Sequence, residues 1–111
     1  MEFKRWDVVA VHYPFVEGTE AKKRPGLIVS DGRLVSAHGL YWVVMITTAK
    51  AGVKPDDIPV TNPRSVGLPD DCVIRVPRLA SLGKMQISHI LGSITTKDRT
   101  AVASLLKRFC P

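Results

Sequence analysis

The sequence predicts a mainly β (α+β) fold, in which short strands form a small, strongly bent β-barrel and one α-helix follows at the C-terminus. Short apolar runs recur along the chain, and Pro, Gly, Asn or Asp bound most of them, as is typical of strands. Only the last segment shows the spacing of an amphipathic helix. At 111 residues the chain can bury one hydrophobic core, so we expect a single domain over residues 1–111.

The first half of the chain is expected to contain strands and turns only. A Val-rich run predicts the first strand, which Pro14 ends. Polar residues at 17–20 and the Ser30-Asp31-Gly32 triplet predict turns. Residues 48–56 are rich in Ala, Gly, Lys and Pro, which predicts a mobile loop. The strands expected in this half are residues 6–13, 26–29, 34–36 and 41–47.

The second half is expected to complete the barrel and then to form the helix. We expect an edge strand at residues 57–61, a strand at 72–76 that Pro77 stops, and further β structure at 87–91. Thr95 is expected to cap the helix, with Asp98 three residues later completing a capping box. The apolar face that would pack on the barrel consists of Val102, Leu105, Leu106 and Phe109.

Composition excludes several classes of protein. Lys and Arg number 16 against 10 Asp and Glu, and the net charge of +6 favours phosphate backbones or acidic proteins as partners. No apolar stretch is long enough for a membrane span, and the charged N-terminus does not resemble a secretory signal, so we expect a cytoplasmic protein. Two Cys and three scattered His predict neither a disulfide framework nor a metal site, and no cofactor is expected.

The basic triplet Lys22-Lys23-Arg24 lies directly before an apolar run that reads as a buried strand. A guanidinium fixed at the end of a strand can bind phosphate through two parallel hydrogen bonds, which an ammonium cannot do. Arg24 is therefore the first candidate for chemistry. The alternative is an ordinary solvated turn.

Segments along nearly the whole chain resemble the MazF/PemK family of bacterial toxin endoribonucleases. Each segment alone is a common strand and turn pattern, and their shared order carries the resemblance. They are Asp7-Val8-Val9 with Tyr13-Pro14-Phe15, residues 24–30 (RPGLIVS), residues 43–48 (VVMITT), Gly67-Leu68 before residues 72–76 (CVIRV), residues 79–84 (LASLGK) and residues 91–95 (LGSIT).

The resemblance implies an SH3-like barrel that forms a homodimer and cleaves single-stranded RNA without a metal. It also implies a cognate antitoxin that occupies the RNA groove, as in type II toxin-antitoxin systems. The catalytic pair of the family corresponds to Arg24 and Thr47, and a further Arg corresponds to Arg75. The sequence departs from the pattern at Pro77, where some members have an Asp, and at Ala80, where an Arg is common.

Cleavage of RNA by its own 2′-hydroxyl requires a proton acceptor, a proton donor and cations that stabilise the charge on phosphorus. Arg24 suits the last requirement, and the Thr47 hydroxyl can orient a phosphate oxygen. His12 is the candidate acid or base, because imidazole titrates near neutrality. Two roles are open for Arg75: it could contact a phosphate, or it could form an ion pair with Asp70 or Asp71.

A wider set of residues is expected to contact RNA. Lys22, Lys23 and Arg78 would attract the phosphate backbone. Tyr13 and Phe15 would stack on unpaired bases, whereas Trp42, which apolar residues flank, is expected to pack in the core. The positions that the resemblance adds to this set are Glu20, Thr48 and Ser81.

These observations lead to one main interpretation and two alternatives. The main one is an endoribonuclease toxin that leaves a 2′,3′-cyclic phosphate. The first alternative is a toxin with the same barrel that inhibits DNA gyrase or another protein without nuclease activity. The second is an inactive relative that keeps the barrel as an interaction module.

Overall fold

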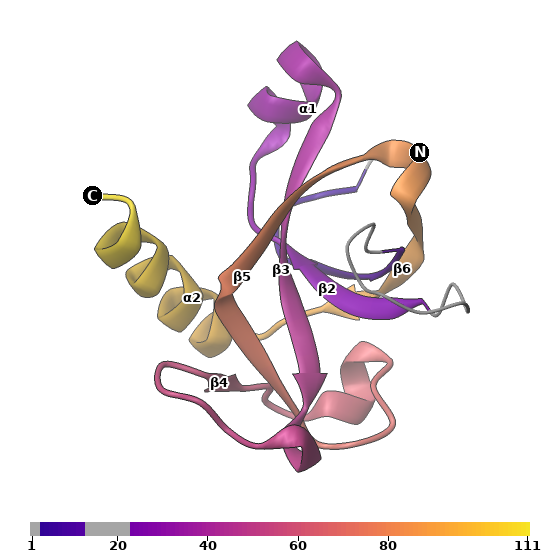
Figure 1. Ribbon diagram of the computed structural model, residues 1–111. Helices are drawn as coiled ribbons and strands as arrows, with labels where there is room; N and C mark the ends of the chain where they lie inside the picture. The colour runs from indigo at the N-terminus through magenta and orange to yellow at the C-terminus, as the bar shows by residue number, and fades with distance from the viewer. Residues whose placement is uncertain (1–2, 13–22) are drawn as a thin grey trace.

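A six-stranded antiparallel sheet forms most of the computed structural model, which describes residues 3–12 and 23–111, and a C-terminal helix packs against it (Figure 1). The strands are β1 (Asp7–Val11), β2 (Arg24–Ile28), β3 (Leu40–Thr48), β4 (Ile58–Pro59), β5 (Cys72–Gly83) and β6 (Ile87–Ser93). The helices are α1 (Gly32–His38) and α2 (Thr96–Phe109), and short 3-10 turns lie at η1 (Ala49–Ala51), η2 (Pro63–Val66) and η3 (Lys84–Gln86). The mainly β fold with a C-terminal helix is confirmed.

The strands follow the order β4-β5-β3-β2-β1-β6. Among the described strands, β4 and β6 each have one neighbour, so the sheet is open and its hydrogen bonds do not close the expected barrel. The edge position expected for residues 57–61 is confirmed, since β4 pairs only with β5. No described helix is long and apolar enough to cross a membrane.

Apolar side chains cover both faces of the central strands. Successive residues of a strand point to opposite faces, and neighbours such as Val43 and Val44 are both fully buried. One face carries Val44 and packs on Val102 and Leu105 of α2. The other face carries Val43 and packs on Tyr41 and other residues of the sheet itself. The molecule therefore has two apolar cores, one on each face.

Residues 34–36 do not form the expected strand, because they lie in helix α1. The Asp31 carboxylate caps this helix by accepting the Arg33 backbone N–H at 3.0 Å, and it also binds the Arg33 guanidinium. Gly39 ends the helix in the left-handed conformation at φ 69°. The hydrogen bonds from Arg33 lower the pKa of Asp31 to about 2. Two capping residues thus override the apolar pair that suggested a strand.

Pro77 does not end a strand as expected, because β5 continues to Gly83. Val44 of β3 pairs with Leu79, whereas the next residue, Met45, pairs with Arg75. Three residues of β5, at positions 76–78, therefore form an irregularity with no partner on β3. Proline has no N–H to donate, so an interruption of this kind is where a long strand can accommodate it.

The remaining strands differ from expectation mainly at their ends. β1 begins after Trp6, whose φ of 78° breaks the strand, and the expected end at residue 13 lies outside the described residues. β2 begins two residues before the expected start, at Arg24, and β6 extends to Ser93. Residues 49–57 are a loop that contains η1 and follows β3 directly.

Helix α2 begins as expected, since the Thr95 hydroxyl accepts the Asp98 backbone N–H at 3.3 Å. The Asp98 side chain does not complete a capping box, because its carboxylate accepts hydrogen bonds from Thr61 instead. Val102 and Leu105 are buried as predicted, whereas Phe109 near the end of the helix is 45% exposed.

Candidate functional site

Arg24, the first residue of β2, and Thr47, the last but one of β3, lie at the same end of two neighbouring strands. Strand β2 pairs with β3 through Gly26 and Met45, and continuation of this register places Arg24 opposite Thr47. Residues opposite each other in an antiparallel pair project from the same face. Arg24 is exposed and Thr47 is half-buried.

His12 follows the strand that borders Arg24 on its other side. Val11, the last residue of β1, pairs with Arg24. The next residue, His12, donates its backbone N–H to the carbonyl oxygen of Gln86 at 2.8 Å and is half-buried. His12 therefore lies close to the end of β2, although continued alternation along β1 would point its side chain to the face opposite to that of Arg24.

Arg75 forms an ion pair with Asp57, and not with Asp70 or Asp71. The Nε and Nη2 atoms donate to the Asp57 carboxylate at 3.1 and 2.8 Å. The side chains are only 13% and 1% exposed, respectively. The hydrogen bond from Arg75 lowers the pKa of Asp57 and raises the pKa of Arg75, so both groups remain charged. Asp57 was not among the predicted site residues, because the loop before β4 brings it to β5.

A cavity of about 280 Å³ lies beside Arg24. Thr48 lines it, although Thr48 follows Thr47 in the strand and projects from the opposite face. Burial and the nearby Asp70 and Asp71 raise the pKa of Cys72, so this thiol remains protonated and apolar. The lining combines cations, a hydroxyl and a carboxylate with apolar walls: Lys23, Arg24, Thr48, Asp70, Leu68, Pro69, Cys72, Leu91, Ala10, Pro25 and Gly67.

The other residues expected to contact RNA lie elsewhere or outside the described part. Ser81 pairs with Trp42 on the face opposite to that of Arg24 and Thr47. Arg78 is exposed in the irregular segment of β5. Neither residue lines the cavity beside Arg24. Four of the expected contacts, Tyr13, Phe15, Glu20 and Lys22, lie outside the described residues.

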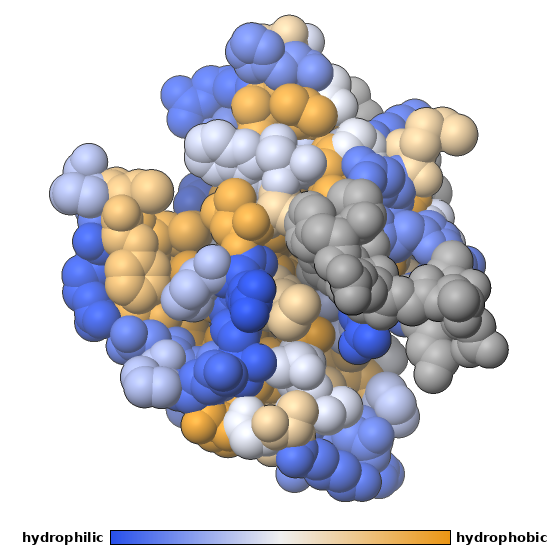
Figure 2. Space-filling model, viewed as in Figure 1, coloured by the Kyte–Doolittle hydropathy of each residue, from blue (hydrophilic) through white to orange (hydrophobic). Residues whose placement is uncertain are grey.

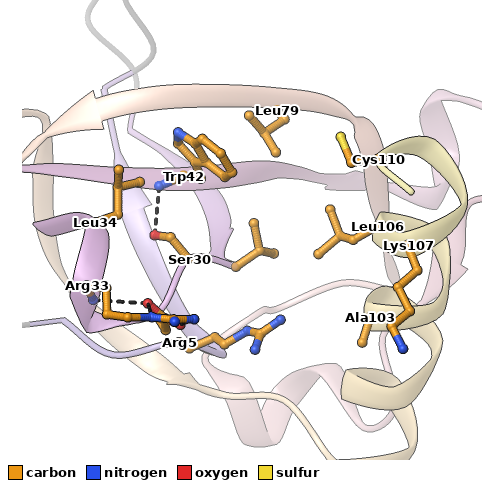
Figure 3. Close-up of a pocket in the computed structure, with 12 residues that line it drawn as sticks. Arg5, Ser30, Arg33, Leu34, Trp42, Leu79, Ala103, Leu106, Lys107 and Cys110 are labelled. Carbon is orange, nitrogen blue, oxygen red and sulfur yellow. Dashed lines mark hydrogen bonds and ion pairs between the residues drawn. The ribbon is translucent and has the colours of Figure 1, made fainter.

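Trp42 is 47% exposed, so the expectation that it packs in the core is wrong. It projects into a groove of about 460 Å³ between the sheet and α2, opposite Leu106 (Figure 3). The space-filling view shows apolar residues gathered between α2 and the middle of the sheet, with hydrophilic residues around them (Figure 2). Arg5, Lys107 and the Asp31–Arg33 ion pair also line the groove.

Alternation along β3 does not explain this exposure. Trp42 lies between Tyr41 and Val43, which are both buried on the opposite face. Alternation places Trp42 on the face that carries Val44 and Ile46. Those two residues are buried, so the face alone does not account for the exposure of Trp42. The exposure arises because α2 covers only part of the strand.

Within residues 3–12 and 23–111, no three His, Cys, Asp or Glu side chains form a group that could hold a metal ion.

Comparison with known proteins identifies the fold. A family model described as "PemK-like, MazF-like toxin of type II toxin-antitoxin system" matches residues 4–110. The chain superposes on MazF from Deinococcus radiodurans with a TM-score of 0.76 and 16% identity, over 96% of this chain and 94% of that chain. No curated protein sequence matches it significantly.

Two further solved structures have the same fold. An endoribonuclease in complex with its cognate antitoxin from a mycobacterial species superposes with a TM-score of 0.70 and 19% identity, over 96% of this chain and 91% of that chain. The Mycobacterium tuberculosis toxin MazF-mt6 superposes with a TM-score of 0.72 and 17% identity, over 92% and 93%. At these identities, the structural matches bear on the fold.

Proposed function

Because this chain belongs to the PemK-like, MazF-like toxin family of type II toxin-antitoxin systems, we propose that it is an endoribonuclease that cleaves single-stranded RNA. The feature that supports this most directly is the register of β2 and β3, since its continuation beyond Gly26 and Met45 would bring Arg24 opposite Thr47 on one face. A guanidinium and a hydroxyl in this arrangement can bind two oxygens of one phosphodiester.

The reaction requires little covalent chemistry from the protein. The ribose 2′-oxygen attacks phosphorus, the bond to the 5′-oxygen breaks, and the products are a 2′,3′-cyclic phosphate and a 5′-hydroxyl. The 2′-hydroxyl proton goes to a base, and the departing 5′-oxygen receives a proton. RNA supplies the nucleophile itself, so no metal-bound water is required.

Each nearby residue would then have a distinct role. Arg24 would stabilise the negative charge that develops on the phosphate oxygens, since its guanidinium is always protonated. Thr47 would donate a hydrogen bond to the same phosphate and fix its orientation. His12 is the candidate proton acceptor. It follows Val11, which pairs with Arg24, and no other histidine in the described residues directly follows or precedes a partner of Arg24.

The cavity beside Arg24 suits a nucleobase next to the cleaved phosphate. Apolar walls such as Pro25 and Pro69 offer surfaces for stacking, and Thr48 and Asp70 offer hydrogen-bonding groups for a base edge. Lys23 at the same cavity would bind a flanking phosphate. Arg78 and Ser81 would then contact nucleotides farther from the cleaved bond.

The proposal extends to partners and location. The family relationship supports a homodimer and a cognate antitoxin in the cytoplasm, and the net charge of +6 favours an acidic partner. Light scattering of the purified protein tests the dimer. Co-purification with the product of an adjacent short gene tests the antitoxin.

The experiment that tests cleavage uses purified protein and a single-stranded RNA in the presence of a chelator. Wild-type protein is expected to yield fragments with 2′,3′-cyclic phosphate and 5′-hydroxyl ends, and Arg24→Ala is expected to yield almost none. Absence of cleavage by the wild-type protein over a panel of RNA sequences would contradict the proposal, as would undiminished cleavage by Arg24→Ala.

A second candidate function is a toxin that inhibits DNA gyrase or another protein without cutting RNA. The observation that favours it is the engagement of Arg75 by Asp57, together with Pro77 where some family members have an Asp. Expression that arrests growth while cellular RNA stays intact and DNA supercoiling fails would select this function.

A further inference from the structure

Arg75 is bound to the loop of residues 49–57, which joins β3 to β4. Its Nη2 donates to the Asp57 carboxylate at 2.8 Å and also to the carbonyl oxygen of Gly52 at 3.1 Å. The same carboxylate accepts the backbone N–H of Lys54 at 2.7 Å. One guanidinium and one carboxylate therefore hold the loop at three points.

This ion pair is too buried to be exchanged easily for a substrate phosphate. The Asp57 side chain is 1% exposed and that of Arg75 is 13% exposed. If the guanidinium moved to a phosphate, the carboxylate would remain buried without its partner, which is strongly unfavourable. Arg75 thus differs from Arg24, which is exposed at its strand end.

The loop that Arg75 holds begins immediately after the strand end that carries Thr47. Thr47 pairs with Val73 and Met45 pairs with Arg75, so Thr47 and Arg75 lie diagonally on one face of the β3–β5 pair. The loop also carries two exposed cations, Lys50 and Lys54. The position of the loop therefore determines how far the ammonium groups of Lys50 and Lys54 lie from Thr47.

We propose that Arg75 is a positioning residue for RNA cleavage: its ion pair with Asp57 fixes the loop of residues 49–57, so that Lys50 and Lys54 can bind the RNA strand next to Thr47. This rests on the proposed endoribonuclease function. In this proposal Asp57 contributes to substrate binding, and Arg75 acts on the RNA through the loop instead of contacting a phosphate itself.

A comparison of two neutral variants tests this role. Arg75→Gln and Asp57→Asn each remove one charge of the pair, and both are expected to raise KM for RNA about tenfold while kcat changes less, because a displaced binding group weakens substrate positioning. The double variant is expected to match either single variant, since the second substitution removes nothing that remains. Arg75→Lys, which keeps the charge but loses the forked contact, is expected to lie in between.

The chain offers a matched control on the same loop. Arg108 of α2 pairs with Asp56 at 3.1 Å, and these side chains are 61% and 36% exposed. Arg108→Gln removes an Arg–Asp pair and one positive charge from the same region, and it is expected to keep KM within about twofold of wild type, as exposed pairs contribute little.

A direct phosphate contact predicts a different pattern. Asp57→Asn would then keep or increase activity, because it frees the guanidinium, whereas Arg75→Gln would lower kcat strongly. That result would overturn the proposal, and so would wild-type kinetics in both variants. If Arg75→Gln fails to fold, Asp57→Asn and Arg75→Lys still distinguish the two roles.

Hydrogen exchange separates this proposal from the proposed function. The backbone N–H groups of Gly52, Lys54 and Asp57 are hydrogen-bonded within the loop, and both neutral variants are expected to increase their exchange rates. Unchanged exchange would refute the role of the ion pair even if RNA is cleaved. Faster exchange in a protein that cleaves no RNA would refute the endoribonuclease function and leave the ion pair as a loop anchor.

Discussion

The carboxylate of Asp98 accepts two hydrogen bonds from Thr61, which precedes it by 37 residues. The backbone N–H of Thr61 donates at 2.8 Å and its hydroxyl at 2.9 Å. Asp98 is 2% exposed whereas Thr61 is exposed, so this contact is partly buried. It joins the first turn of α2 to the segment after β4, and the helix is thereby held at its beginning by polar contacts and along its length by Val102 and Leu105.

Asp98→Ala is expected to lower the free energy of unfolding by about 2–3 kcal/mol, because it removes both hydrogen bonds that the carboxylate accepts from Thr61. Thr61→Val removes only the hydroxyl contact and is expected to cost about 1 kcal/mol. Urea denaturation measures both. A loss in Asp98→Ala no larger than that in Thr61→Val would contradict the importance of the backbone contact.

Gly92→Ala is expected to destabilise the protein by about 1–3 kcal/mol through overpacking. A Cβ at this position in β6 would lie 2.8 Å from the backbone Cα of Val66, which cannot move aside as a side chain can. Gly32→Ala is the matched control, since a Cβ added there would have no atom within 4 Å and the residue begins helix α1. Thermal melting should show a lower Tm for the first variant and an equal or higher Tm for the second.

Stability is expected to fall in acid partly through Asp57. Its pKa is lowered in the folded protein, chiefly by the hydrogen bond from Arg75, so the charged form contributes stability above its unfolded pKa of about 4. This contribution is lost as pH decreases through the folded pKa. Asp57→Asn should therefore be less stable than wild type at neutral pH, and the difference should shrink below about pH 4. Urea titrations at several pH values check this, and a difference independent of pH would be inconsistent with it.

Thr47→Ser is expected to retain most of the RNA cleavage, whereas Thr47→Val is expected to reduce kcat by about 10–100-fold, because only the hydroxyl can donate to phosphate. Arg24→Lys should fall between wild type and Arg24→Ala, since an ammonium keeps the charge without the forked donors. Single-turnover cleavage measures these rates. Equal rates for Thr47→Ser and Thr47→Val would remove the hydroxyl from the mechanism.

Lys23→Gln is expected to make RNA binding less dependent on salt. Lys23 lines the cavity beside Arg24, and the loss of one phosphate contact should reduce the slope of log K against log salt by about 0.7 for a single strand. Lys97→Gln, in the first turn of α2 and outside that cavity, should leave the slope unchanged. Fluorescence anisotropy with a labelled RNA measures both, and identical slopes would place the RNA elsewhere.

The strands were predictable where apolar runs meet clear breakers, as at β2 and β3. Helix α1 was missed because its apolar content is small and its stability comes from the two capping residues, Asp31 and Gly39. The length of β5 was missed because Pro77 usually ends a strand, and only the pairing with β3 shows that an irregularity accommodates it.

The candidate site was predictable to the extent that its residues end strands. Arg24 follows from the basic triplet before an apolar run and from the family resemblance, whereas Thr47 follows from the resemblance alone. The partner of Arg75 did not follow, since Asp57 reaches it only through the pairing of β4 with β5. The exposure of Trp42 depends on how far α2 extends over the sheet, which local sequence does not encode.

Strands β2 and β3 have a hydrogen-bonded neighbour on each side and an apolar core on each face. Thermal fluctuations that detach β4 or β6 at the margins consequently leave the centre intact, and the centre opens only when the whole domain unfolds. Arg24 belongs to β2 and Thr47 to β3, so both residues lie on these central strands. A binding partner that contacts only β4 or β6 would therefore leave the mutual orientation of these two side chains unchanged.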